Sequence, residues 1–189
     1  MENEKVKQIR MNALVAEFVY ANKIKWLARF NLLINILTII LPIIITAALL
    51  VIKGTSYEGI GNIISILLSA VLLGLVILSL LMKTEDRKIS YHICKKDNKY
   101  VANEALKLIK ETDDKLSWFY TYIAEIDARD SDFLSSITDN LSKKAYRNAL
   151  MKLIPGSTSV VCPVCHASPF TFDKGLCQVC GNTPGKTTM

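Results

Sequence analysis

Two long uncharged stretches constrain this sequence more than any other feature. Residues 30–52 and 60–82 are each 23 residues long, and neither contains Asp, Glu, Lys, Arg or His. As α-helices they would each be about 34 Å long, which is enough to cross a hydrocarbon core of about 30 Å. The short polar loop KGTSYEG separates them. The pattern predicts a transmembrane hairpin of two helices.

The distribution of charge supports this interpretation over a soluble fold. Only Lys53 and Glu58 among the charged residues fall within 30–82, whereas the rest of the chain has an ordinary soluble density of charge. Two core helices of a soluble protein would need amphipathic helices long enough to wrap them. A cleaved signal peptide would have an apolar core of only about 7–15 residues, nearer the N-terminus.

The basic residues beside the spans predict the orientation of the hairpin. Lys23, Lys25 and Arg29 precede the first span, and the second is followed by Lys83, Arg87, Lys88, Lys95, Lys96 and Lys99. Since positive residues favour the cytoplasmic side, both termini should be cytoplasmic. The net charge of +6 is spread along the chain. That spread suits anionic lipid headgroups and argues against nucleic acid, which needs a concentrated basic face.

The regions around the hairpin predict further helices. Within 1–29, an apolar stripe has helical spacing, with Lys5, Lys7 and Arg10 off it, and this helix either continues into the span or lies on the membrane surface. The stripe comprises Val6, Ile9, Ala13, Ala16, Tyr20, Ile24 and Leu27. Residues 83–154 predict a cytoplasmic helical stalk, with helix starts capped by Asp113 or Asp114 and by Asp130 or Ser131. The apolar stripes on these helices must pack against each other, against the N-terminal helix or against a second copy of the chain, so oligomerisation is one of the expected arrangements.

Four cysteines near the C-terminus carry the strongest chemical signal. Cys162 and Cys165 form one Cys-x-x-Cys pair, Cys177 and Cys180 form another, and eleven residues separate the pairs. Four thiolates at this spacing can close a tetrahedron around Zn²⁺. Gly181 and His166 follow the pairs and tolerate the tight turns that they need. We predict a zinc ribbon at 157–189, with 170–172 as a strand and 173–175 as a hairpin turn.

Other uses of these cysteines remain open. Disulfides are disfavoured in a reducing cytoplasm. Cys162 to His166 also matches the c-type haem pattern Cys-x-x-Cys-His, although such haem attachment occurs outside the membrane and would leave Cys177 and Cys180 without a role. Iron in a rubredoxin-like site uses similar knuckles. Because four thiolates leave no open coordination position, we expect a structural metal. His92 and His166 are the only histidines, and we expect no enzymatic activity.

Small and weakly polar residues follow helical spacing inside both spans. They either pack helices together or line a water-filled path in an oligomer. The candidates for these roles are Asn31, Asn35, Thr38, Thr46, Asn62, Ser65 and Ser69. Pro42 deletes one helical hydrogen bond and is expected to kink the first span. The absence of ionisable residues from both spans argues against a proton relay.

The arrangement of helices over residues 5–154 resembles the SLATT family of two-transmembrane proteins from prokaryotic conflict systems. Cys162, Cys165, Cys177 and Cys180 reproduce the spacing of a subgroup named for its mobilome CxxCx(11)CxxC motif. The resemblance implies a membrane effector of bacterial defence in the inner membrane, which permeabilises or otherwise perturbs that membrane. No nucleotide-sensor domain is recognisable, so the resemblance implies a trigger from a sensor or regulatory partner, with the zinc ribbon coupling the signal.

Two functions follow from these observations. The first is an oligomeric effector of a mobile-element or anti-phage system that perturbs the membrane. The second is a non-lytic membrane adaptor, whose zinc ribbon binds a protein or nucleic acid. A third hypothesis, a redox protein holding iron or haem, would give coloured material on purification. The predicted fold for all three is an all-α membrane protein with a small four-cysteine module.

Overall fold

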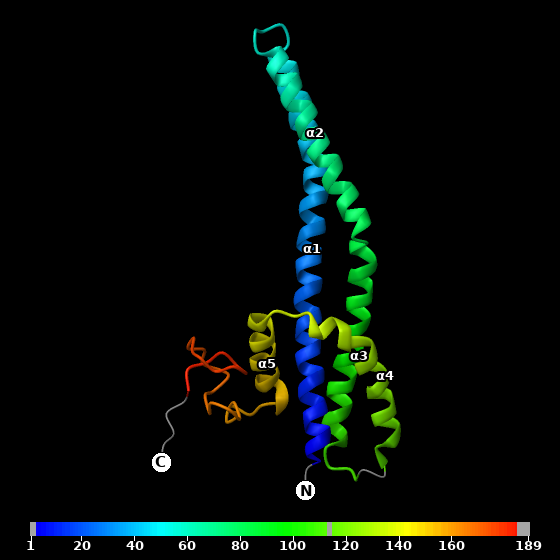
Figure 1. The fold of residues 1–189 in the computed structure, drawn as a ribbon, viewed down its shortest axis with the longest axis vertical. Coiled ribbons are helices and arrows are strands. Elements are labelled where there is room, and N and C mark those ends of the chain that lie inside the picture. Colours follow the sequence, from blue (N-terminus) through cyan, green and yellow to red (C-terminus); the bar gives the residue numbers. More distant parts are fainter. Residues whose placement is uncertain (1–2, 113–114, 185–189) are drawn as a thin grey trace. The chain divides into compact units, whose positions relative to one another are not determined.

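The computed structural model describes residues 3–112 and 115–184, without the side chain at position 132. Within these ranges the chain forms helices and no strand, which confirms the predicted all-α fold. The helices are α1 (Glu4–Ile52), α2 (Glu58–Leu81), α3 (Thr84–Leu108), α4 (Ser117–Ser135) and α5 (Asp139–Leu153), as Figure 1 shows. They belong to two compact units, one comprising 1–22 with 91–189 and the other comprising 23–90.

The apolar unit is a hairpin made by the second half of α1 and by α2. The two helices contact each other along one face, where Leu41, Ile45 and Leu49 of α1 are half-buried. Gly61 permits a close approach to α1, because a Cβ there would overlap the side chain of Ile52. Both helices are long and apolar enough to cross a membrane, and α2 has no buried residue.

α1 is one continuous helix from Glu4 to Ile52, so the N-terminal helix continues into the first apolar stretch. Pro42 lies inside it without ending it. The hydroxyl of Thr38 donates to the carbonyl oxygen of Ile34 at 2.7 Å, and that of Thr46 donates to Pro42 at 2.8 Å. Such bonds to the preceding turn satisfy polar side chains in an apolar helix without any partner from another element.

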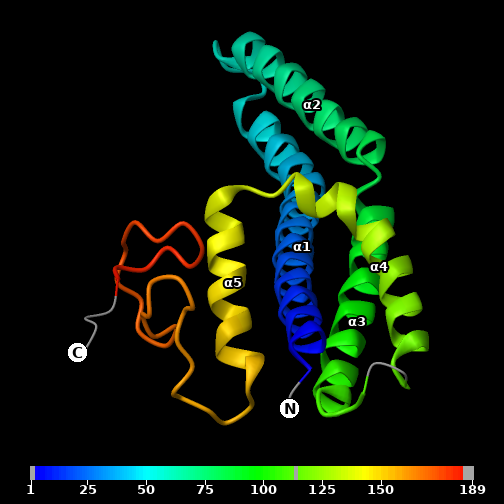
Figure 2. The same ribbon diagram turned by 60° about the horizontal axis from the view of Figure 1, so that its bottom comes forward.

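The helical unit packs around the first half of α1. Figure 2 shows this half between α5 on one side and α3 with α4 on the other. The predicted apolar stripe is confirmed, with Val6, Ala13, Ala16 and Tyr20 all buried. Leu116 and Phe119 of the α4 region and Ala149 and Leu150 of α5 complete the core. A smaller aromatic cluster stacks Tyr20 on Phe133 with ring centroids 4.9 Å apart.

Arg10 is a correction to the predicted polar face of α1. Only 4% of this residue is exposed, and its guanidinium donates to the carbonyl oxygens of Ala102 (2.9 Å) and Lys152 (3.1 Å). Lys152 lies in the last turn of α5, where carbonyls lack a helical partner and favour a cation. Burial lowers the pKa of Arg10. One side chain thus connects α1, α3 and α5.

The predicted helix start at Asp130 or Ser131 is also wrong. α4 runs through both residues to Ser135, and the next helix begins at Asp139 after Thr138. Asp130 is instead buried, and its carboxylate accepts hydrogen bonds from Asn98 (2.6 Å) and Arg129 (3.1 Å). It therefore fastens α4 to α3 rather than capping a helix. The predicted cap at Asp113 or Asp114 lies outside the described residues.

Candidate metal centre

The four predicted cysteine ligands lie together. Their sulfur atoms are all within 4.8 Å of one another, all four residues are buried, and none is in a disulfide. Four sulfurs bound at about 2.3 Å to one central ion would lie about 3.8 Å apart. The cluster is therefore the right size to hold a single metal ion, and its donors are those that Zn²⁺ and iron accept in tetrahedral sites.

Two similar turns bring the cysteines together. The N–H of His166 donates to the carbonyl of Cys162, and the N–H of Gly181 donates to that of Cys177, both at 2.9 Å. His166 has φ +55° and Gly181 has φ +72°, so the predicted left-handed positions are confirmed. The first cysteine of each pair also donates its own N–H to the residue five positions later. The two knuckles therefore repeat one backbone motif.

The knuckle geometry favours the thiolate form at one position. Burial opposes ionisation of Cys177, but the backbone N–H groups of Cys180 and Val179 that bond to its sulfur lower its pKa to about 6. Burial raises the pKa of Cys180, and the neighbouring cysteine sulfurs raise it further. Four crowded thiolates repel one another, so a bound cation is what would allow all of them to ionise.

Asn182 organises the segment between the knuckles and was not predicted from the sequence. It is 2% exposed. Its Oδ1 accepts the N–H of Asp173 at 3.0 Å, and its Nδ2 donates to the carbonyls of Ser168 (3.0 Å) and Thr171 (3.1 Å). The expected strand at 170–172 is absent from the described chain; a single antiparallel bridge joins Lys174 to Asn182. Side-chain hydrogen bonds replace the expected β-ladder.

Gly175 lies very close to the backbone that follows the second knuckle. A Cβ on Gly175 would overlap the backbone of Thr183, so this position requires glycine for space. The N–H of Gly175 donates to the carbonyl of Gly181 at 3.0 Å, and that of Thr183 donates to Asp173 at 2.8 Å. These two hydrogen bonds join residues 173–175, before the second knuckle, to residues 181–183, after it.

The four-cysteine module packs against α5. The guanidinium of Arg147 donates to the carbonyl of Cys180 at 2.8 Å and stacks on the ring of Phe172. Lys143 donates to the side chain of Gln178 at 3.4 Å. The cysteines belong to the same hydrophobic core as Leu150. The metal centre is therefore part of the helical unit.

The structure separates the predicted polar residues of the hairpin into two groups. Asn31 and Ser65 are half-buried, and the amide of Asn31 donates to Glu85. The other predicted residues are exposed on the outside of the hairpin. These are Asn35, Thr38, Thr46, Asn62 and Ser69.

Comparison with known proteins places the chain in a family. No curated protein and no solved structure gives a significant match. A family model described as Mobilome CxxCx(11)CxxC protein matches residues 3–183, which include both knuckles, the hairpin and all five helices. The four buried cysteines supply the motif for which that family is named. The chain therefore belongs to the Mobilome CxxCx(11)CxxC protein family.

Proposed function

We propose that this protein is a membrane effector of a mobile-element or anti-phage conflict system, related to the SLATT family, that oligomerises and permeabilises or otherwise perturbs the bacterial inner membrane. The observation that carries this proposal is the exposure of the apolar side chains of the hairpin. In the most apolar windows of the two long helices, only 6% and 0% of residues are buried. The core helices of a soluble protein would be mostly buried, whereas these surfaces need lipid or another copy of the chain.

The polar side chains on the outside of the hairpin support self-association. Asn35, Thr38 and Thr46 recur on α1 and are exposed rather than turned to α2. The threonine hydroxyls already donate hydrogen bonds to carbonyl oxygens of α1. The free-energy cost of placing a polar side chain in lipid therefore falls mainly on the amide of Asn35. A second copy could satisfy that amide, or several copies could turn this face towards water. We place both termini in the cytoplasm, following the lysines and arginines that flank the spans.

The metal is proposed to be structural zinc. Four thiolates leave no open position for a substrate or water, and the colourless d¹⁰ ion suits a tetrahedral site without imposing redox chemistry. When bound, it would supply folding free energy to a segment with little core of its own. Iron is the competing ion. We assign no catalytic residue and propose that the protein is not an enzyme.

A depolarisation assay tests the membrane proposal. We expect induced wild-type protein to collapse the membrane potential of bacteria, monitored with a voltage-sensitive dye during phage challenge. Asn35→Leu should weaken this effect because it removes the amide, while Ile43→Leu, also on the exposed surface of α1, should not. Full polarisation with healthy growth in cells that contain membrane-inserted wild-type protein would refute the effector function.

A membrane adaptor is the second candidate, favoured by two exposed apolar side chains beside the cysteine cluster. Val164 is 60% exposed and Leu176 is 89% exposed, and they line a shallow hollow with His166 and Pro184. Exposed apolar side chains at such a hollow suit contact with a regulatory protein. Val164→Ser with Leu176→Ser should abolish the activity of an adaptor. A membrane effector with these changes would still depolarise cells when overproduced.

A further inference from the structure

The cysteine cluster needs positive charge that its own segment does not supply. A divalent ion bound by four thiolates leaves the centre with a net negative charge, because the ligands must be deprotonated. Between residues 157 and 184 the other formal charges are those of Asp173 and Lys174, which cancel. A buried net charge is costly unless an opposite charge lies close to it. The compensating cation should therefore come from another element.

Helix α5 presents two basic side chains to the second knuckle. A Cβ on Gly181 would lie 3.6 Å from Cβ of Lys143 and 3.9 Å from Nη1 of Arg147, so both side chains run beside this backbone. Lys143 is already paired with Asp139, with 2.7 Å between Nζ and Oδ2. Arg147 has no carboxylate partner among the residues that the structure describes. Of these two cations, Arg147 is the one whose charge remains available to the cluster.

The guanidinium of Arg147 contacts two parts of the cysteine segment. Its Nη1 donates to the carbonyl oxygen of Cys180 at 2.8 Å, and its Cζ lies 3.7 Å from the centroid of the Phe172 ring. A planar guanidinium can donate a hydrogen bond and stack on a ring at the same time, which an ammonium group does less well. Arg147 therefore positions the second knuckle and brings a positive charge beside it.

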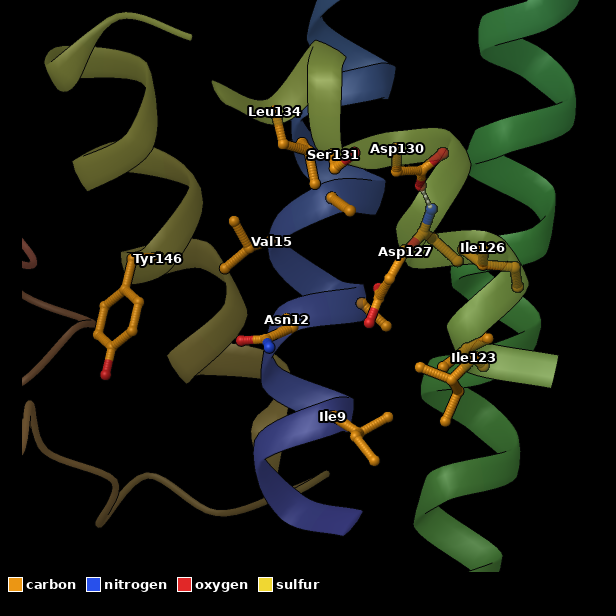
Figure 3. Close-up of a pocket in the computed structure, with 14 residues that line it drawn as sticks. Ile9, Asn12, Val15, Ile123, Ile126, Asp127, Asp130, Ser131, Leu134 and Tyr146 are labelled. Atoms are coloured by element: carbon orange, nitrogen blue, oxygen red, sulfur yellow. Dashed lines mark hydrogen bonds between the residues drawn. The ribbon is translucent and has the colours of Figure 1, made fainter. Parts of the chain in front are cut away.

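The same helix packs apolar side chains against the module. Leu150 belongs to the same buried core as the four cysteines. Tyr146 lines a hollow with Val160 and Pro163 of the first knuckle region. In Figure 3 the side chain of Tyr146 extends from α5 away from α1. Folding of the module around a metal ion therefore covers an apolar face of α5.

Helix α5 depends on this packing for its stability. It has 15 residues, and isolated helices of about 12–15 residues are marginal in water. Its other support comes from Arg10 of α1, which donates to the carbonyl oxygen of Lys152 in the last turn of α5. The module and the α1 side thus hold the helix together, and loss of either should loosen it.

We propose that Arg147 couples metal binding to the stability of α5. The metal-loaded module covers α5, and α5 in turn raises the affinity of the module for its ion through the charge and the hydrogen bond of Arg147. Such a coupling is reciprocal, because each event favours the other by the same free energy. It rests on the proposed structural metal and does not depend on the membrane function. Metal occupancy thereby controls how firmly α5 is held in the helical unit.

The zinc affinity of the full-length protein in detergent, measured by competition with a chromophoric chelator, tests the effect of Arg147. Arg147→Gln should lower the affinity at least about tenfold, which corresponds to one charge-assisted hydrogen bond. Arg147→Lys keeps the charge and should recover part of this loss. Lys144→Gln is the matched control, because Lys144 is exposed on the same helix and its loss changes the net charge equally.

Amide hydrogen exchange, followed by mass spectrometry, tests the reciprocal effect on α5. Removal of Zn²⁺ from the wild type should speed exchange in α5 more than in α4, which lies on the other side of α1 (Figure 2). Arg147→Gln should reduce this difference, and Lys144→Gln should not.

Three results would each overturn the coupling while leaving the metal site in place. These are equal zinc affinities of Arg147→Gln and Lys144→Gln, no recovery in Arg147→Lys, and exchange in α5 that does not respond to the metal. Wild-type protein that binds no Zn²⁺ would refute the proposed structural zinc itself, and the coupling with it.

Discussion

Removal of the Asn182 side chain should loosen the metal module without touching a ligand. Asn182→Ala deletes three hydrogen bonds, which join the second knuckle to the segment around Ser168, Thr171 and Asp173. Ser168 is half-buried and the other two are exposed, so water can partly replace what is lost. Each hydrogen bond should therefore contribute a net stabilisation of about 1 kcal/mol, and the loss of all three should cost about 3 kcal/mol.

This loss should appear as weaker metal binding, because folding of a small metal module and binding of its ion are one equilibrium. About 3 kcal/mol corresponds to about a hundredfold loss of Zn²⁺ affinity. Competition with a chromophoric chelator, on the full-length protein in detergent, measures that affinity. Gln178→Ala is the control, because Gln178 is exposed on the same knuckle and its side chain bonds only weakly to Lys143.

Affinity of Asn182→Ala within about threefold of both the wild type and the Gln178→Ala control would refute this reasoning. It would mean that the knuckles hold the ion without help from the segment between them. A similar loss in both variants would instead indicate that any change in the second knuckle is disruptive.

Three further predictions concern single positions. Cys162→Ser should lower the zinc content, measured by elemental analysis, and unfold the four-cysteine module. The hairpin should still resist carbonate extraction from membranes. Full zinc occupancy in this variant would contradict ligation by four thiolates. Gly175→Ala should cost several kcal/mol because its Cβ overlaps the backbone of Thr183, and chelator competition should report faster metal release; unchanged release would show that this approach can relax. Asp127→Asn should raise the Tm of the helical unit at pH 7, since burial raises the pKa of Asp127 and the ionised form is the one that destabilises the fold. That advantage should vanish on acidification below the ordinary aspartate pKa of about 3.9, where the wild type is also neutral; an advantage that persists there would point to another cause.

The sequence correctly predicted those features that a short stretch of chain determines by itself. The length and apolarity of the two spans, the stripe from Val6 to Tyr20, and the cysteine spacing each lie within a short stretch of chain. His166 and Gly181 also follow locally, because a tight knuckle needs a left-handed residue after its second cysteine. The all-α fold and the cysteine cluster could therefore be inferred before any coordinates.

The predictions failed for residues whose hydrogen-bond partners lie in distant segments of the chain. Arg10 lies off the apolar stripe, and charged residues are usually exposed, but its hydrogen-bond acceptors lie 92 and 142 residues away in sequence. Asp130 resembles a helix cap, yet Asn98 of α3 supplies its partner. Asn182 gave no local signal beyond its place after the second knuckle. In each case a buried polar side chain satisfies groups that sequence periodicity does not identify.

The helical unit is assembled from two separate parts of the chain, and this affects the order of its synthesis. The first 22 residues and the hairpin leave the ribosome well before α5 and the cysteine knuckles. Val6 and Met11 therefore lack most of their core neighbours until most of the polypeptide has been translated. The hairpin can therefore form before the rest of the protein is complete, whereas the four cysteines can come together only near the end of synthesis.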